Sequence, residues 1–144
     1  MILEDIILIT FTTKETLLES LPNHKIIIGK LYDDTVFIGN CKIILDYHTW
    51  TITGWYIEKQ YQNKGFGNQL LKETFQYLLK ENGIPDKIDY IWDGTNQYVY
   101  DWLVDNFDAY CDCPLAVQKY SSEDDWTSHI YHLNVEKIFS YFNL

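Results

Sequence analysis

The chain lacks the features that mark several classes of protein. No apolar run approaches the roughly 20 residues that a membrane-spanning helix needs. The first residues, Met-Ile-Leu-Glu-Asp, lack the basic region of a secretory signal peptide. No charge-rich tail and no Pro/Ser-rich linker interrupts the 144 residues, of which 47% are hydrophobic. We therefore expect one folded domain over residues 1–144, located in the cytoplasm and without a membrane partner.

Cysteine is scarce. Cys41, Cys111 and Cys113 are odd in number and have no framework spacing, which favours reduced thiols. Cys111 and Cys113 could form half of a metal site, but the sequence holds no second pair. No His/Asp framework accompanies the thiols, so an acyl-cysteine intermediate is not expected. We predict small side chains near a strand and no bound metal.

Positive charge is also in short supply. Lys and Arg together number 11 against 21 Asp and Glu, which gives a formal net charge of −10. This balance argues against a nucleic-acid partner, because phosphate binding needs a basic face. An acidic surface instead favours cationic partners such as amines, polyamines or basic peptides.

The first third of the chain is rich in strand-forming residues. We expect a strand over 6–10 and then a helix over 12–21, capped by a threonine and with leucines on one face. Three segments rich in β-branched and aromatic residues predict further strands: 24–31, 36–47 and 50–57. The second of these is one long strand or two, with Gly39-Asn40 as a bulge or a tight turn.

The best-supported element is a helix over 68–82, because its leucines and Phe75 form an apolar stripe at helical spacing. Gly83 is placed to end this helix. The elements expected after it are a strand over 88–92, a helix over 97–106, strands over 115–120 and 127–133, and a closing helix capped by Asn134. This order predicts a mixed α/β domain with a C-terminal helical addition over 134–144.

The stretch from Gln62 to Gly67, Gln-Asn-Lys-Gly-Phe-Gly, joins the strand over 50–57 to the helix over 68–82. Two glycines on such a turn let the backbone come close to a bulky anion. The helix start adds free N–H groups and the positive end of its dipole. Together they predict a phosphate cradle. The spacing matches neither the dinucleotide fingerprint nor the P-loop, so those two classes are disfavoured.

The same stretch matches Gln/Arg-x-x-Gly-x-Gly/Ala, the pyrophosphate-binding motif of the GNAT superfamily of acetyl-coenzyme A-dependent N-acetyltransferases. The order of elements also resembles that family over most of residues 1–133. The resemblance implies a mixed, mostly antiparallel central sheet with two splayed parallel strands and flanking helices. It further implies direct transfer of an acetyl group from acetyl-coenzyme A to a primary amine of a small molecule or peptide. A homodimer is left open.

By this resemblance, coenzyme A lies where the strands over 50–57 and 88–92 splay apart. The backbone of Tyr56 and Ile57 would bond the acetyl carbonyl and the pantetheine. The N–H groups of the loop and helix start would hold the pyrophosphate: Gln62, Asn63, Lys64, Gly65, Phe66, Gly67 and Asn68. Lys64, and also Lys59, would supply local positive charge. Asn96 would contact pantetheine or only cap the second helix.

The resemblance is weaker for the catalytic groups. The family commonly places a tyrosine on the second helix as general acid, but Trp102 stands at the corresponding position. Tyr98 or Tyr100 could serve if the helix is offset. The family's glutamate before the glycine loop is replaced by Thr51, which cannot act as a base. Asp46 and His48 lie one hairpin away, and either could act as the base through a water; His48 has the better intrinsic pKa and is the candidate.

Thr51 and Trp102 leave two other interpretations open. One is a non-catalytic acyl-coenzyme A-binding sensor or interaction module, which would share the pyrophosphate loop with an enzyme. The other is an interaction protein whose glycine loop binds nothing.

Overall fold

The computed structural model of the chain describes residues 9–17, 24–92, 97–111 and 129–144. The strand expected over 115–120 and the candidate residue Asn96 lie outside these ranges. No helix of the described residues is both long and apolar enough to cross a membrane.

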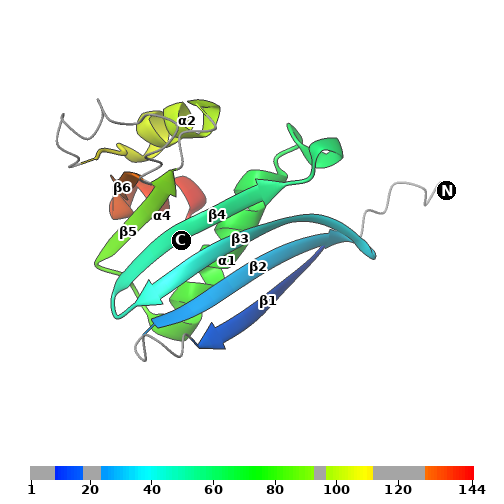
Figure 1. Cartoon of the computed structure of the whole chain (residues 1–144), viewed down its shortest axis with the longest axis horizontal. Helices are drawn as coiled ribbons and strands as arrows, with labels where there is room; N and C mark the ends of the chain where they lie inside the picture. The colour runs from blue at the N-terminus through cyan, green and yellow to red at the C-terminus, as the bar shows by residue number, and fades with distance from the viewer. Residues whose placement is uncertain (1–8, 18–23, 93–96, 112–128) are drawn as a thin grey trace, which may run out of the picture.

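Six strands form one sheet in the order of the sequence (Figure 1). They are β1 (Ile9–Leu17), β2 (His24–Asp33), β3 (Val36–Asp46), β4 (Thr49–Ile57), β5 (Lys87–Trp92) and β6 (His129–Leu133). Strands β4 and β5 run parallel, and the other neighbouring pairs are antiparallel. The expected sheet, mostly antiparallel with one parallel pair, is confirmed.

Strand β1 corrects the prediction of a helix over 12–21, because the described part of that segment pairs antiparallel with β2. Ile9, Phe11 and Thr13 are half-buried and alternate with exposed neighbours, which is the period of a strand. Leu17, a core residue in the helical interpretation, is 68% exposed. Pairing with β2 and the strand preference of the threonines outweigh the helical spacing of the leucines.

Three described helices pack on one face of the sheet: α1 (Phe66–Asn82), α2 (Gln97–Phe107) and α4 (Val135–Phe142). In Figure 1, α1 and α4 lie behind the strands. Helix α1 begins two residues before the predicted range and ends as expected, at Gly83 with φ of +79°. Asn134 caps α4 as predicted, because its Oδ1 accepts the N–H of Lys137 at 3.0 Å.

The core lies between this sheet face and the helices. The Trp50 ring of β4 is 5.6 Å from that of Phe75 on α1 and 6.4 Å from that of Phe139 on α4. Ile138 and Phe142 are buried, so the C-terminal helix is part of the core. Burying each large apolar side chain contributes about 1.5–3 kcal/mol. Among the described residues, no helix lies on the opposite sheet face (Figure 1).

The cysteines differ in part from the expectation of reduced thiols. Cys41 is a free thiol and is fully buried. Cys111 is disulfide-bonded, which corrects the prediction. An odd number of cysteines leaves room for one such bond, so the count alone did not exclude it.

Candidate functional site

Strands β4 and β5 separate near the middle of β4. They pair in parallel only as far as Ile52 and Tyr90, so the last five residues of β4 have no parallel partner in the described chain. The register between β3 and β4 shifts between Lys42 and Ile43, which leaves Thr53 as an extra residue in β4. A bulge of this kind bends a strand and increases its twist. It turns β4 away from β5 and produces the expected fork.

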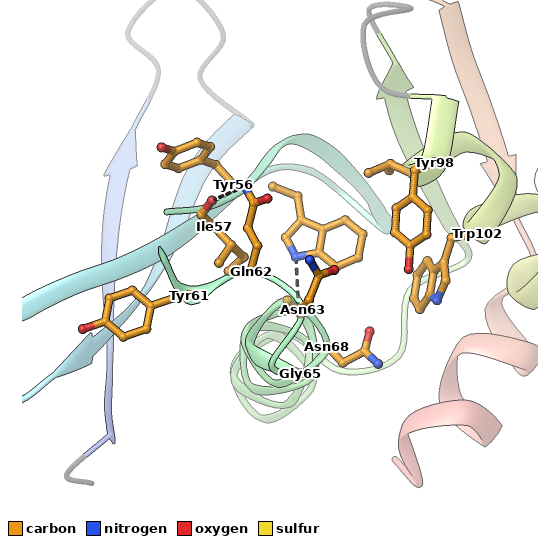
Figure 2. A pocket seen from close by; sticks show the side chains of 12 residues that line it. Tyr56, Ile57, Tyr61, Gln62, Asn63, Gly65, Asn68, Tyr98 and Trp102 are labelled. Atoms are coloured by element: carbon orange, nitrogen blue, oxygen red, sulfur yellow. Dashed lines mark hydrogen bonds between the residues drawn. The ribbon is translucent and has the colours of Figure 1, made fainter. Parts of the chain in front are cut away.

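A cavity of about 410 Å³ opens where the end of β4, the glycine loop and α2 meet (Figure 2). The predicted residues that line it are Tyr56, Ile57, Gln62, Asn63, Gly65, Gly67, Asn68 and Tyr98. Four others complete the lining: Trp55, Tyr61, Val99 and Trp102. No motif singled out Tyr61 or Val99. Trp102 lies one helical turn after the candidate Tyr98, so the helical register of α2 could have placed it beside the cavity. Figure 2 shows Tyr98 and Trp102 facing the glycine loop across the cavity.

Other predicted residues lie beside the cavity without lining it. The Lys64 Nζ is exposed and lies 6.0 Å from the centroid of the Tyr61 ring. The Phe66 ring packs edge-on against Tyr61 at 5.7 Å. Tyr100 packs against Tyr131 of β6, with ring centroids 5.1 Å apart.

His48 is not brought to the cavity. It lies in the turn between β3 and β4, at the opposite end of β4 from Ile57. Nine steps at a strand rise of about 3.3 Å separate the two positions by about 30 Å. The His48 carbonyl accepts the N–H groups of Asp86 and Lys87, so this turn anchors the start of β5.

The glycine loop ends in a helix N-terminus whose first backbone donors have no helical acceptor. Gly65, the N-cap of α1, is left-handed with φ of +85°, and Asn63 is also left-handed with φ of +61°. The first helical bond runs from Gln69 N–H to Gly65 O at 3.1 Å. Phe66, Gly67 and Asn68 therefore form the first turn, whose N–H groups have no acceptor within a helix. This turn contains no acidic residue, so it favours an anion.

The indole of Trp55 ties the end of β4 to the start of α1. Its Nε1 donates to the carbonyl of Gly67 at 3.0 Å, and its ring lies beside the Gly67 Cα. The indole also packs against Trp102 of α2, with ring centroids 5.4 Å apart. The two tryptophans give the cavity an apolar wall next to its polar loop.

Three side-chain hydrogen bonds form around the loop. Gln62 Nε2 donates to the Ile57 carbonyl at 3.0 Å. The Tyr56 hydroxyl donates to Glu58 Oε2 at 3.2 Å, and this hydrogen bond raises the pKa of the phenol. Tyr61 donates to Asp33 at 3.4 Å, and its pKa is raised by desolvation and then by that carboxylate.

Helix α4 reaches the cavity through one hydrogen bond. Asn68, in the first turn of α1, donates from Nδ2 to the Tyr141 hydroxyl of α4 at 3.0 Å. The Tyr141 ring also packs edge-on against Trp102 at 5.7 Å. The two hydrogen-bonded residues are 73 positions apart, so sequence reasoning had no signal for this contact. Within the described ranges, no group of three or more metal-ligating side chains is present.

Comparisons with known proteins give the following likenesses. The model of the acetyltransferase (GNAT) family matches residues 9–101. The structure is similar to PaiA N-acetyltransferase of Thermoplasma acidophilum in complex with coenzyme A, with a TM-score of 0.57. The two sequences are 16% identical, and the match covers 76% of this chain and 60% of that one. This chain therefore spans less than two thirds of that relative.

Two further solved structures are similar. N-acetylglutamate synthase of Neisseria gonorrhoeae, complexed with coenzyme A and N-acetyl-glutamate, has a TM-score of 0.52 and 18% identity over 74% of this chain and 26% of that one. Arabidopsis thaliana Naa50, in complex with the bisubstrate analogue CoA-Ac-MVNAL, has a TM-score of 0.54 and 14% identity over 73% of this chain and 70% of that one. No curated protein matches the chain in sequence.

Proposed function

Because the chain belongs to the acetyltransferase (GNAT) family, we propose that it is an enzyme that binds acetyl-coenzyme A in the cavity of about 410 Å³ and transfers the acetyl group to a primary amine. One observation carries the proposal. The fork between β4 and β5 opens directly beside the first turn of α1, whose N–H groups have no helical acceptor. One ligand with an anionic group and an extended chain can then place the anionic group on this turn and the chain in the fork.

The glycine loop would hold the pyrophosphate. The N–H groups from Gln62 to Asn68 supply backbone donors, and the α1 dipole adds positive potential. Every basic side chain of the 11 counted is a lysine, so no guanidinium can clamp the phosphates. Lys64 is the cation of the loop itself and contributes a point charge. Backbone donors therefore have the larger role in this site.

The fork would hold the pantetheine arm. Beyond Ile52, the edge of β4 that faces β5 has no strand partner in the described chain, so its polar groups there can bond an amide-rich arm. Trp55, Val99 and Trp102 supply the apolar wall. Backbone N–H groups near Tyr56 would polarise the thioester carbonyl, which is how acyl transfer is commonly stabilised.

Direct transfer is favoured over an acyl-enzyme. Cys41 is buried, and burial raises the pKa of its thiol to about 12, so a thiolate is not available at neutral pH. The amine would attack the thioester carbon, forming the C–N bond as the C–S bond breaks. Tyr98, which lines the cavity and is 73% exposed, is the better placed of the two candidate tyrosines to protonate the leaving thiolate.

The acceptor is proposed to be a cationic amine of a small molecule or peptide. The net charge of −10 supports a positively charged partner. One similar structure is complexed with N-acetyl-glutamate and another with a peptide bisubstrate analogue, so both kinds of acceptor occur among structures of this fold. We also propose that the enzyme works in the cytoplasm and that residues 1–144 act as one domain.

The pyrophosphate site is tested by Asn68→Glu. A carboxylate in the first turn of α1 suits the helix dipole, so the fold should be retained, but it repels phosphates. Gln76→Glu is the matched control, because this exposed residue carries the same added charge on the same helix, away from the cavity. Isothermal titration with acetyl-coenzyme A should show at least about 10-fold weaker binding for Asn68→Glu. This factor corresponds to the loss of about one charge-assisted hydrogen bond. Binding to Gln76→Glu should be unchanged.

Failure of the wild-type protein to bind acetyl-coenzyme A would contradict the proposal. The non-catalytic alternative keeps one supporting observation, namely that Trp102 occupies the cavity wall where a proton-donating tyrosine was expected. Binding of acetyl-coenzyme A without thiol release in the presence of any amine would favour that alternative.

A further inference from the structure

We propose that the acceptor is a peptide with carboxylate side chains close to its reacting amine, and that Lys14, Lys30 and Lys42 bind these carboxylates. The three lysines lie on the open face of the sheet, which is the face opposite the described helices (Figure 1). This inference rests on the proposed function and deepens it, because it narrows the class of acceptor. The reacting amine is still a cation, and the inference adds anionic groups at a set distance from it.

The alternation of side chains places Lys30 and Lys42 on the open face. In β2, Leu31 is buried against the helices, so the preceding residue, Lys30, points to the opposite face. In β3, Lys42 lies between Cys41 and Ile43, which are both buried on the helical side. Lys42 is exposed and Lys30 is half-buried, so solvent reaches both side chains.

The third lysine joins these two in one patch. Lys14 of β1 is the register partner of Ile28, and Ile28 is the register partner of Lys42, so the two lysines flank Ile28 in one row. Lys30 lies two residues further along β2. At a strand spacing of about 4.8 Å and a rise of about 3.3 Å, the three Cα atoms lie about 8–10 Å from one another. Flexible side chains of this length can bring two ammonium groups to one carboxylate.

The positive charges of this patch are not compensated. None of the three lysines forms an ion pair with a described residue. Among the described open-face residues of β1, β2 and β3, the carboxylate is Asp46, which lies at the end of β3 and pairs with His24 at 3.3 Å. Exposed charges more than about 8 Å apart are largely screened at physiological ionic strength. The local lysines, rather than the net charge of −10, therefore determine which groups bind here.

Tyr56 connects the lysine patch to the cofactor cavity. It lines that cavity, and it is the register partner of Asn40, which in turn pairs with Lys30. The side chain of Trp55 points to α1, so that of Tyr56 points to the open face. Figure 2 shows the Tyr56 ring directed away from the opposite wall of the cavity. A ligand on the open face can therefore extend to the site proposed for the thioester.

The register sets the distance between the amine and the carboxylates. Lys42 is one strand and two residues from Tyr56, about 8 Å away, and Lys30 is two strands away, about 10 Å. Between Lys42 and Tyr56, Gly54 has no side chain, and the Lys42 Cβ is the described atom nearest its Cβ position, at 3.7 Å. This leaves room for a chain. An extended peptide rises about 3.3 Å per residue, which places the carboxylates on the second and third residues from the amine.

The charge reverses at the end of the patch where the amine would lie. Glu58 directly follows β4, its Oε2 accepts the Tyr56 hydroxyl at 3.2 Å, and it forms no ion pair with a described residue. An ammonium group followed by carboxylates is therefore complementary to Glu58 followed by the lysines. From Tyr56 to Lys14 the surface spans about 16 Å, which is the length of a short peptide rather than of one amino acid.

The double substitution Lys30→Gln with Lys42→Gln tests the assignment. Lys25→Gln is the matched control, because Lys25 is an exposed lysine of the same strand whose register partner, Leu45, is buried on the helical side. The acceptors are two amidated hexapeptides that differ only at the second and third residues, Ala-Glu-Glu-Ala-Ala-Ala and Ala-Gln-Gln-Ala-Ala-Ala. Thiol release from acetyl-coenzyme A gives kcat and KM for each peptide.

Each exposed ion pair contributes up to about 5-fold, so we expect the wild-type protein to prefer the glutamate peptide by about 5- to 30-fold in kcat/KM. The double variant should lose this preference through a higher KM for the glutamate peptide, with kcat unchanged, because the lysines bind ground state and transition state alike. Its rate with the glutamine peptide and its affinity for acetyl-coenzyme A should stay within about 3-fold of wild type. Lys25→Gln should keep the preference, and added salt should reduce it.

Equal use of the two peptides by the wild-type protein overturns the inference, as does a preference that persists in the double variant. An equal loss with both peptides in that variant indicates a structural role and also overturns it. Turnover of spermidine but of neither peptide overturns the inference and leaves the proposed function in place. Acetyl-coenzyme A binding without thiol release to any amine overturns it together with the catalytic proposal, and absence of acetyl-coenzyme A binding defeats the proposed function itself.

Discussion

Single residues decide how closely an anion can approach the glycine loop. Gly65 has φ of +85° and open space where a Cβ would lie, so its backbone conformation is what calls for glycine. Gly67 is helical, and a Cβ there would lie 3.4 Å from the Trp55 ring, which is ordinary contact. The two glycines of one motif therefore differ: the left-handed backbone calls for glycine at position 65, whereas at position 67 neither the backbone nor a neighbouring side chain does.

Cys41 gives a pH prediction at this scale. Burial raises the pKa of its thiol from 9.0 to about 12 in the folded protein, despite the opposing hydrogen bond with Thr74. The folded state thus holds the proton more tightly, and this contribution to stability is complete below pH 9 and is lost as pH rises toward 12. The free energy of unfolding should fall by about 1 kcal/mol more in the wild type than in Cys41→Ala between pH 9 and 10. Urea unfolding at the two pH values measures this difference, and parallel losses in the two proteins would contradict it.

Two contacts between elements position the cavity. The first is between Gly39 of β3 and the backbone of Tyr56 and Ile57 at the end of β4. A Cβ on Gly39 would overlap the Tyr56 carbonyl oxygen and crowd the Ile57 Cα, whereas a Cβ on Gly54 would lie 3.7 Å from its nearest neighbour, Lys42 Cβ. Gly39→Ala should therefore displace the end of β4, with a loss of about 1–3 kcal/mol of stability and weaker acetyl-coenzyme A binding.

Gly54→Ala is the matched control on β4 itself and should change the free energy of unfolding by less than about 0.5 kcal/mol. Urea unfolding and titration calorimetry on both variants check the prediction. Equal effects of the two substitutions would show that the approach of β3 to the Tyr56 carbonyl does not shape the cavity.

The second contact is the hydrogen bond between Asn68 of α1 and Tyr141 of α4. Tyr141→Phe keeps the ring contact with Trp102 and removes only the hydroxyl that accepts from Asn68 at 3.0 Å. It should lower stability by about 0.5–1.5 kcal/mol and weaken acetyl-coenzyme A binding a few-fold, because the Asn68 side chain is then no longer held at the cavity. A double-mutant cycle with Asn68→Ala isolates the pair. Strict additivity of the two substitutions, in both stability and binding, would show that the contact has no energetic role.

Local patterns predicted most of the elements but few of the contacts between them. The leucines of α1, Gly83 at its end and the Asn134 cap are local signals, and each is confirmed. The helix over 12–21 was wrong because Leu17 and its neighbours have helical spacing, while strand pairing with β2 decides the structure. The fork was expected only from the family resemblance. Gly54 directly follows the extra residue Thr53, but a single glycine within a strand pattern does not by itself locate a bulge.

Contacts between distant residues account for the rest of the site. Asn68 and Tyr141 are 73 positions apart, and neither segment alone indicates that their side chains meet beside the cavity. Sequence reasoning placed a base at His48, which the fold sets at the other end of β4 from the cavity.

At the scale of the whole molecule, the described helices pack on one face of a six-stranded sheet, and the cavity of about 410 Å³ lies where the end of β4, the glycine loop and α2 meet. The protein carries a net charge of −10, whereas the first turn of α1 beside this cavity contains no acidic residue. This contrast suits the proposed polyanionic acyl donor and cationic acceptor.

The most direct test of the central claim is the release of free thiol from acetyl-coenzyme A by the purified protein, measured with and without an amine acceptor. The acceptors are spermidine, a small aromatic amine and a lysine-containing peptide. The account predicts release that depends on the acceptor and yields the N-acetylated amine in equal amount. Tight binding of acetyl-coenzyme A with no acceptor-dependent release would contradict the transferase and leave a binding module in its place.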